Sequence, residues 1–205
     1  MTERWCDFGP LRVGYDDTVL EPRPWTVAQS RHAAALLERA PAGPLLELHC
    51  GAGHIGQAAA VWSGRALVQV DDDPHACDWA RRNAAANDVD ADVRCATVEA
   101  LDAPDDTFAL VLADPPYVPS TETARFSTDP LHAIDGGADG LDAVRACLPV
   151  AARLTRPGGA VVLQVRGPGQ ARAVGHAARD DAVRLDVLGT VVVAPDRAVV
   201  LLTRH

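Results

Sequence analysis

The sequence contains no lysine: its 19 basic side chains, histidine aside, are all arginine, against 28 acidic residues and a net charge of −9. No segment concentrates these arginines. An acidic chain without a dense basic segment is a poor general binder of nucleic acid, because phosphate contacts dominate that affinity. Arginine with abundant alanine, aspartate, glycine and proline indicates a GC-rich genome rather than a function. A nucleic-acid partner is therefore not favoured by charge, unless the fold assembles a local arginine surface.

Long apolar runs and secretory signals are also missing. No run approaches the roughly 20 residues of a membrane span, and the first residues lack the basic-then-apolar pattern of a signal peptide. We expect a cytoplasmic protein with no membrane partner. The five cysteines form no C-x-x-C pair and the seven histidines do not fall at metal-ligand spacings, so we expect neither a disulfide framework nor a bound metal.

One segment of the chain has the pattern of a nucleotide-binding loop. The apolar run 45–48 leads into Gly51, Gly53 and Gly56, which complete a G-x-G-x-x-G before a helix rich in small residues. Glycines there let the backbone turn sharply and approach a ligand at the helix N-terminus. Asp71 follows Gly51 by twenty residues, at the end of the next apolar run, where such folds place the acid that holds ribose hydroxyls. The spacing predicts an adenosine-containing cofactor.

Strand and helix patterns alternate along most of the chain. This alternation predicts an α/β fold with a mostly parallel sheet and helices on both faces, ending in an antiparallel pair of strands because only 189–196 link the last two. At 205 residues one domain is expected, with 1–24 an extended lead-in, including a short hairpin around 14–17, and 25–205 the catalytic core. Strands are predicted at 45–49, 66–70, 92–95, 108–113, 160–165, 183–188 and 197–203, and helices at 26–40, 54–62, 74–87, 140–154 and 170–179.

Charge selects among the adenosine cofactors. Glu47 lies four residues before Gly51, inside the strand that leads into the loop. A carboxylate there opposes the anionic pyrophosphate of a dinucleotide but favours S-adenosylmethionine, which carries a sulfonium and an ammonium group. A dinucleotide-dependent oxidoreductase stays as an alternative, and it would bind NAD.

The predicted chemical centre follows the strand at 108–113. Asp114, Pro115, Pro116 and Tyr117 come directly after this strand, at the same sheet edge as the glycine loop. Two prolines fix the backbone and remove two N–H donors, so carbonyl and carboxylate acceptors lie beside an aromatic ring. This set suits a planar NH2 group held for attack on a methyl sulfonium.

The order Glu47, Gly51-Ala52-Gly53, Asp71 and Asp114-Pro115-Pro116-Tyr117 resembles class I S-adenosylmethionine-dependent methyltransferases of Rossmann-like fold with a seven-stranded sheet. The segment 129–142, DPLHAIDGGADGLD, resembles the "EP…AL.GG.DGLD" segment of the HemK/PrmC family, and 20–26 resembles its "IPRP.TE". That family methylates the glutamine of the GGQ motif in peptide-chain release factors.

The resemblance implies in-line methyl transfer to nitrogen and gives the site residues their roles. Asp114, Pro115, Pro116 and Tyr117 would hold the acceptor NH2 group. The predicted cofactor residues are Glu47, His49, Gly51 and Gly53 for the methionine part, Asp71 for the ribose, Asp72, Ala96 and Thr97 beside the adenine, and Asp114. His49 is included as a flank of the loop, although a lone histidine there is more often packed than catalytic.

The sequence differs from the family pattern in three respects. The catalytic tetrapeptide begins with Asp114, whereas the family has Asn at this position. Asp at this position is common in enzymes that methylate adenine or guanine. Trp25 and Val27 replace acidic residues of the "RP.TE" segment, and the N-terminal helical domain of the bacterial enzymes is expected to be lacking. The leading hypothesis is a protein glutamine N-methyltransferase acting on a release factor. The alternatives are an RNA or DNA base-amino methyltransferase, which an arginine surface beside Tyr117 would favour, and a noncatalytic partner subunit.

Overall fold

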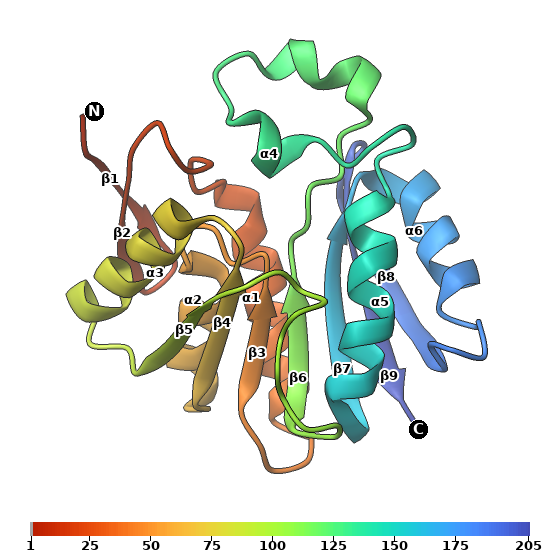
Figure 1. The fold of residues 1–205 in the computed structure, drawn as a ribbon. Coiled ribbons are helices and arrows are strands. Elements are labelled where there is room, and N and C mark those ends of the chain that lie inside the picture. Colours follow the sequence, from red (N-terminus) through yellow and green to blue (C-terminus); the bar gives the residue numbers. More distant parts are fainter. Residues whose placement is uncertain (1) are drawn as a thin grey trace.

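The computed structural model describes residues 2–205, and a seven-stranded sheet of order β5-β4-β3-β6-β7-β9-β8 forms its centre (Figure 1). The pairs β5–β4, β4–β3, β3–β6 and β6–β7 are parallel, whereas β9 is antiparallel to both β7 and β8. The predicted α/β class and the antiparallel last pair are therefore confirmed. The strands are β3 (Leu45–Leu48), β4 (Leu67–Asp71), β5 (Ala91–Cys95), β6 (Phe108–Ala113), β7 (Thr155–Val165), β8 (Leu185–Ala194) and β9 (Arg197–Arg204).

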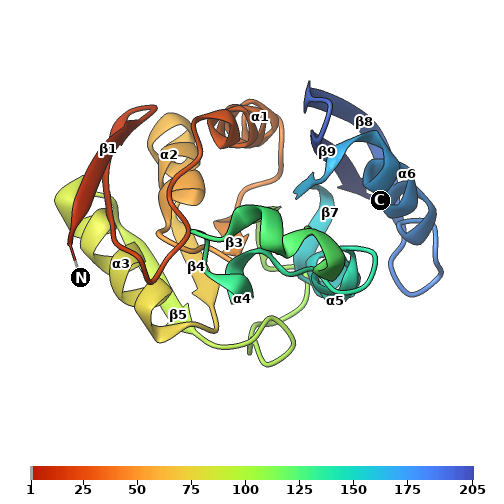
Figure 2. The same ribbon diagram turned by 90° about the horizontal axis from the view of Figure 1, so that it is seen from above.

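Helices cover both faces of the sheet, as Figure 2 shows from above. One hydrophobic cluster joins the sheet to α1 (Val27–Leu37), α2 (His54–Ser63) and α3 (Pro74–Ala86). A second cluster joins the opposite face to α5 (Asp142–Leu154) and α6 (Gly167–Ala177). The central strands β3 and β6 are buried along their whole length, which explains why every residue in them except Glu47 is apolar.

Several predicted boundaries differ from the structure. The turn expected at 156–159 is instead the beginning of β7, α6 begins at Gly167 rather than at Gln170, and β8 runs to Ala194 rather than ending at Leu188. Residues 157–159 lie in an irregular part of β7, where the register against β6 passes from Phe108–Thr155 to Leu110–Ala160, whereas Gly167 and Pro168 form the first turn of α6. Gly189 lies inside β8, at a shift of its register against β9.

The lead-in folds differently from the prediction. Strands β1 (Arg4–Phe8) and β2 (Leu11–Tyr15) form a hairpin whose turn is Gly9-Pro10, so the hairpin expected around 14–17 was wrong. The buried Asn83 side chain of α3 holds β2, since it accepts from the Gly14 amide at 2.7 Å and donates to the Gly14 carbonyl at 2.9 Å. A side chain distant in sequence fixes the hairpin, which local patterns do not reveal.

The connection from β6 to α5 crosses above the carboxyl edge of the sheet (Figure 1). It contains a 3-10 helix, η2 (Ser120–Phe126), and the short helix α4 (Leu131–Ile134), neither of which was predicted. Two ion pairs fasten it: Arg23 binds both carboxylate oxygens of Asp129 at 2.7 Å, and Arg166 binds Glu122 at 2.7 Å. None of the helices in residues 2–205 has the length and apolar character needed to traverse a bilayer.

Candidate active site

Asp71 organises the glycine loop. Its carboxylate accepts the Gly51 amide at 2.8 Å through one oxygen and the Asp73 amide at 3.0 Å through the other. Gly51 has a φ of 51°, in the left-handed region that favours glycine. Burial raises the pKa of Asp71, and the two amide hydrogen bonds oppose this by stabilising the carboxylate. The pair predicted from the twenty-residue spacing thus lies together at the end of β4.

Glu47 lies beneath the loop rather than in the cavity. It is 2% exposed, and its carboxylate accepts the Gly56 amide at 2.9 Å and the Gln69 side-chain amide at 2.5 Å. An added Cβ at Gly56 would meet a Glu47 carboxylate oxygen at 2.4 Å, so Gly56 is needed for this close approach. Burial raises the pKa of Glu47 to about 8. The structure thus places Glu47 under the loop, bonded to the Gly56 and Gln69 amides, and its role toward the methionine part stays a prediction.

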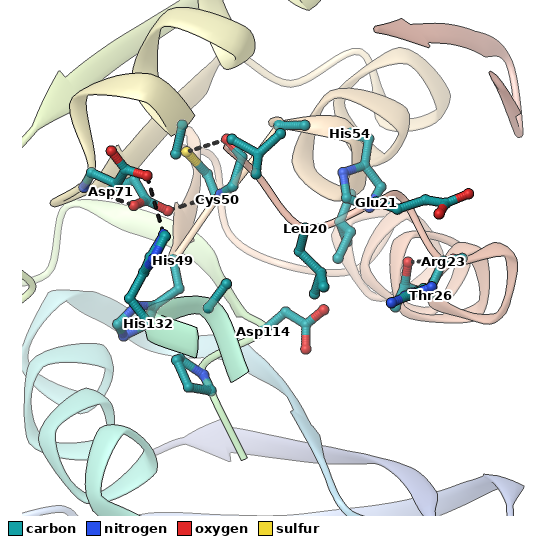
Figure 3. Close-up of a pocket in the computed structure, with 18 of the residues that line it drawn as sticks. Leu20, Glu21, Arg23, Thr26, His49, Cys50, His54, Asp71, Asp114 and His132 are labelled. Atoms are coloured by element: carbon teal, nitrogen blue, oxygen red, sulfur yellow. Dashed lines mark hydrogen bonds and ion pairs between the residues drawn. The ribbon is translucent and has the colours of Figure 1, made fainter. Parts of the chain in front are cut away.

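A cavity opens above this loop, and Figure 3 shows the side chains that surround it. Of the predicted cofactor residues, His49, Gly51, Asp71, Asp72 and Asp114 line it, and Pro116 joins them. Glu47, Gly53, Ala96 and Thr97 do not line it.

Three of the residues outside the cavity have local packing roles. An added Cβ at Gly53 would approach the side chains of Gln57 and Gln69, the Ala96 amide donates to the Asp71 carbonyl, and the Thr97 hydroxyl accepts the Ala100 amide. These residues support the rim of the cavity, and sequence spacing alone does not separate such a role from direct contact.

His49 and His54 both line the cavity, and both are neutral in character. His49 has a φ of 54°, unusual for a residue with a side chain, and its Nε2 is buried without a hydrogen-bond partner in residues 2–205. Burial lowers its pKa against the opposing effect of Asp71 and Asp72. Burial lowers the pKa of His54 to about 3, and its ring packs edge-on against Phe8 at 4.6 Å between centroids.

Asp114 lies where two cavities meet. It lines the cavity above the glycine loop and also a second one of 270 Å³, whose wall includes Pro115 and Tyr117. One of its carboxylate oxygens, Oδ1, is buried and has no partner in the described chain, and burial raises its pKa to about 7. In Figure 3 its side chain lies among the side chains that surround the cavity, near Leu20. The buried Gln29 amide donates to the carbonyl of Ala113 at 2.8 Å and holds the preceding strand end in place.

We call the second cavity the acceptor cavity, and several residues of its wall were not predicted as site residues. They include Trp25, Phe126 and three arginines, Arg23, Arg166 and Arg197. The Arg197 guanidinium lies 3.8 Å from the centre of the Trp25 ring. The family-like segments 20–26 and 129–142 both contribute to this wall, and Trp25 replaces an acidic residue of the family pattern.

The three arginines do not form a free cationic surface. Arg23 pairs with Asp129, Arg166 with Glu122, and Arg197 with Asp196 at 2.7 Å. Each of these guanidinium groups therefore has a carboxylate partner, with Glu122 also bound by Arg125, in contrast to the exposed, unpaired arginine surface that nucleic-acid phosphates require.

The glycine-rich segment 136–140 supports the acceptor cavity from behind. Added Cβ atoms at Gly136 and Gly140 would meet the carbonyl oxygens of Pro116 and Tyr117 at 2.7 and 2.4 Å. The Gln170 side chain donates to the Tyr117 carbonyl at 2.9 Å and to Gly140 at 3.1 Å. The segment thus fixes the Pro-Pro-Tyr backbone by close packing.

The donor groups of the cavity above the loop fit S-adenosylmethionine better than a dinucleotide. A pyrophosphate needs free loop amides, but those of Gly51 and Gly56 already donate to Asp71 and Glu47. Carboxylates of Glu21, Asp71 and Asp114 surround the space, which suits a sulfonium and an ammonium group. Within residues 2–205 there is no group of three His, Cys, Asp or Glu side chains placed to hold a metal ion.

Comparisons with known proteins agree with this geometry. The model of the methyltransferase small domain family matches residues 30–133. A release factor glutamine methyltransferase from Bradyrhizobium diazoefficiens is 36% identical over 180 residues, which cover 82% of this chain and 59% of that protein. The protein of the same name from Mycobacterium tuberculosis is 35% identical over 164 residues, 74% of this chain and 53% of that protein. The chain thus spans about half to three fifths of the length of these relatives.

Solved structures share the fold at low identity. The ribosomal protein L11 methylase from Lactobacillus delbrueckii superposes with a TM-score of 0.64 at 14% identity, covering 91% of this chain and 83% of that chain. TYW2 from M. jannaschii, in complex with AdoMet, gives 0.66 at 11% identity, covering 100% of this chain and 87% of that chain.

A Rossmann-like sheet with two adjoining cavities that share Asp114 at its carboxyl edge is the architecture of a class I methyltransferase. With residues 30–133 matched, the chain belongs to the methyltransferase small domain family.

Proposed function

We propose that this protein transfers a methyl group from S-adenosylmethionine to the side-chain nitrogen of a protein glutamine, in a peptide-chain release factor. The observation that carries the proposal is the position of Asp114 in the wall shared by two cavities. A group-transfer reaction between two substrates needs such a meeting point, where a donor on one side and an acceptor on the other are within reach of the same residue.

The cofactor supplies an electrophilic methyl carbon on a cationic sulfur. Asp71 would hold the ribose hydroxyls with the lone pairs that the Gly51 and Asp73 amides leave free. The loop and the surrounding carboxylates would place the cationic end toward Asp114. Glu47 would act indirectly, because its bond to the Gly56 amide fixes the first turn of α2.

The acceptor NH2 group would donate to Asp114 and to the Pro115 carbonyl, while Tyr117 packs on the amide plane. The nitrogen lone pair then attacks the methyl carbon, the carbon–sulfur bond breaks, and its electron pair stays on sulfur. The nitrogen loses one proton after transfer, and an ionised Asp114 with a pKa of about 7 can take it. Positioning of this kind contributes roughly 7–11 kcal/mol to a bimolecular reaction.

The base-amino alternative is less favoured because every arginine of the acceptor cavity is paired with a carboxylate. The names of the relatives support a protein glutamine as acceptor. The partner-subunit alternative is disfavoured because both cavities and the Asp-Pro-Pro-Tyr segment are formed.

The proposal is tested by supplying radiolabelled S-adenosylmethionine with three acceptors: a purified release factor, bulk tRNA and double-stranded DNA. We expect label in the release factor alone, dependent on Asp114. Label in tRNA or DNA, with none in the release factor, would establish the base-amino alternative instead.

A further inference from the structure

The outer edge of the sheet carries a groove that the proposed reaction does not use. It lies between α6 and β8, encloses 380 Å³, and its floor includes the aliphatic side chains of Val187 and Val192. We call it the α6–β8 groove. In Figure 1, α6 lies in front of β8 at the end of the sheet opposite β5. Three of the seven large hydrophobic side chains that the structure leaves exposed are on β8, and Leu188 and Val192 are each 55% exposed.

The charge of the groove is opposite to that of the whole protein. Its wall contains Arg172, His176 and Arg179, and no acidic residue of the described chain lines it. Arg172 and Arg179 are exposed and have no ion-pair or hydrogen-bond partner for their side chains in residues 2–205. This contrasts with the acceptor cavity, where all three arginines are paired. In a protein of net charge −9, unpaired arginines beside exposed valines indicate an acidic binding partner with apolar side chains.

The groove and the acceptor cavity have no lining residue in common, but neighbouring segments of the chain line both. Arg166 lines that cavity and directly precedes α6, while Pro168, two residues later, lines the groove. On the other side, Val192 lines the groove and Asp196, in the turn to β9, lines the acceptor cavity. A polypeptide that places a side chain in the acceptor cavity can therefore extend along the groove.

The edge of the sheet itself is poorly suited to pairing with another strand. The register of β8 against β9 shifts between Val187 and Gly189 and again between Val192 and Ala194. Such irregularities disrupt the row of backbone groups that an added strand would need. Binding through side chains in the groove is accordingly favoured over extension of the sheet.

We infer that the α6–β8 groove binds an acidic segment with aliphatic side chains in the protein that accepts the methyl group, away from the methylated glutamine. This inference rests on the proposed function. It makes the groove a determinant of affinity for an intact acceptor, not of the chemical step.

Steady-state methylation of two acceptors tests it: an intact release factor, and a short peptide that contains only the residues around its target glutamine. The charge variant is R172E/R179E. The steric variant is Gly175→Leu, since an added Cβ at Gly175 meets only Val187, at 3.5 Å, and a longer side chain there fills the groove. The matched control, R31E/R39E, makes the same charge change on α1 and just beyond its C-terminal end, on the opposite face of the sheet.

Both groove variants should raise KM for the intact factor about tenfold with kcat unchanged, and leave KM for the peptide and the R31E/R39E kinetics as in wild type. Unchanged KM for the intact factor in both groove variants, or an equal rise with the peptide, would overturn the inference.

Direct binding of the intact factor, measured in the presence of S-adenosylhomocysteine, separates the two proposals. Binding that the groove variants weaken, without methylation by the wild type, would refute the proposed reaction and retain the groove. No binding at all would refute the groove. Oligonucleotide binding that R172E/R179E abolishes and Gly175→Leu spares would instead identify a nucleic-acid surface.

Discussion

Asp114 gives the most informative perturbation, because its ionisation affects both stability and activity. Burial raises its pKa from 3.8 to about 7, which corresponds to at most about 4 kcal/mol of unfavourable free energy for the ionised form. Relaxation around buried charges reduces such values, so we expect about 1–3 kcal/mol. An acid with a raised pKa destabilises the folded state when ionised. Its cost is therefore full above about pH 7 and disappears as the pH falls toward 3.8.

Asp114→Asn should be more stable than wild type by about 1–3 kcal/mol at pH 8, with the difference shrinking between pH 7 and 4. Urea unfolding at several pH values measures this, and contributions from other groups such as Glu47 are common to both proteins. Asn keeps one carbonyl acceptor, so the variant should retain methyl transfer, whereas Asp114→Ala should lose about 100-fold or more in kcat/KM.

The pH profile of kcat/KM completes the test. Wild-type activity should rise with pH through about 7, as Asp114 ionises and accepts from the acceptor NH2 group. The Asp114→Asn profile should lack this step. A wild-type profile that is flat from pH 6 to 8, or the same step in Asp114→Asn, would refute the reasoning.

Three further changes have expected outcomes. Asp71→Ala removes the acceptor for the Gly51 amide and should abolish the binding of S-adenosylhomocysteine measured by calorimetry, while NAD should bind to neither protein. A wild-type protein that binds NAD but not S-adenosylhomocysteine would contradict the cofactor assignment. Gly140→Ala forces a Cβ against the Tyr117 carbonyl at a φ of 76° and should lower the free energy of unfolding, measured by thermal unfolding, by about 2 kcal/mol or more. Gly169→Ala, with open space at its Cβ, should lower it by less than half as much. Equal losses of stability in the two variants would show that the close packing at Gly140 is unimportant. Burial lowers the pKa of His54 to about 3, so the unfolded chain takes up a proton below about pH 6.5 while the folded protein does not, and the free energy of unfolding falls as the pH falls from 6.5 toward 3. His54→Phe should therefore lose less of its free energy of unfolding than wild type between pH 7.5 and pH 4.5. An identical pH dependence of unfolding in the two proteins would argue against a buried neutral imidazole.

The sequence predicted the sheet well because its signals are local. The largely apolar strands β3 and β6 are visible in short windows of sequence, and so is the helix start at Pro74, where the Asp73 side chain accepts the His75 amide. The N-terminal hairpin was misplaced because Asn83, on α3, fixes β2 through contacts that no window of the lead-in contains.

The same distinction holds for the site. Asp71, Gly51 and Asp114 were found because their spacing from strand ends reports their position at the sheet edge. The hydrogen bond from the Gly56 amide to Glu47 was not predicted, since spacing places a residue in a strand but does not say which neighbour its carboxylate reaches. The acceptor-cavity wall of Trp25, Arg166 and Arg197 comes from three separate elements, and only the fold brings them together.

The most direct test of the central claim is tandem mass spectrometry of a release factor incubated with this protein and S-adenosylmethionine, beside a release factor whose GGQ glutamine is replaced by glutamate. The account predicts one added methyl group on the side-chain nitrogen of that glutamine in the first factor and none in the second. Methylation at another residue, or an unmodified glutamine alongside a methylated nucleic acid, would contradict it.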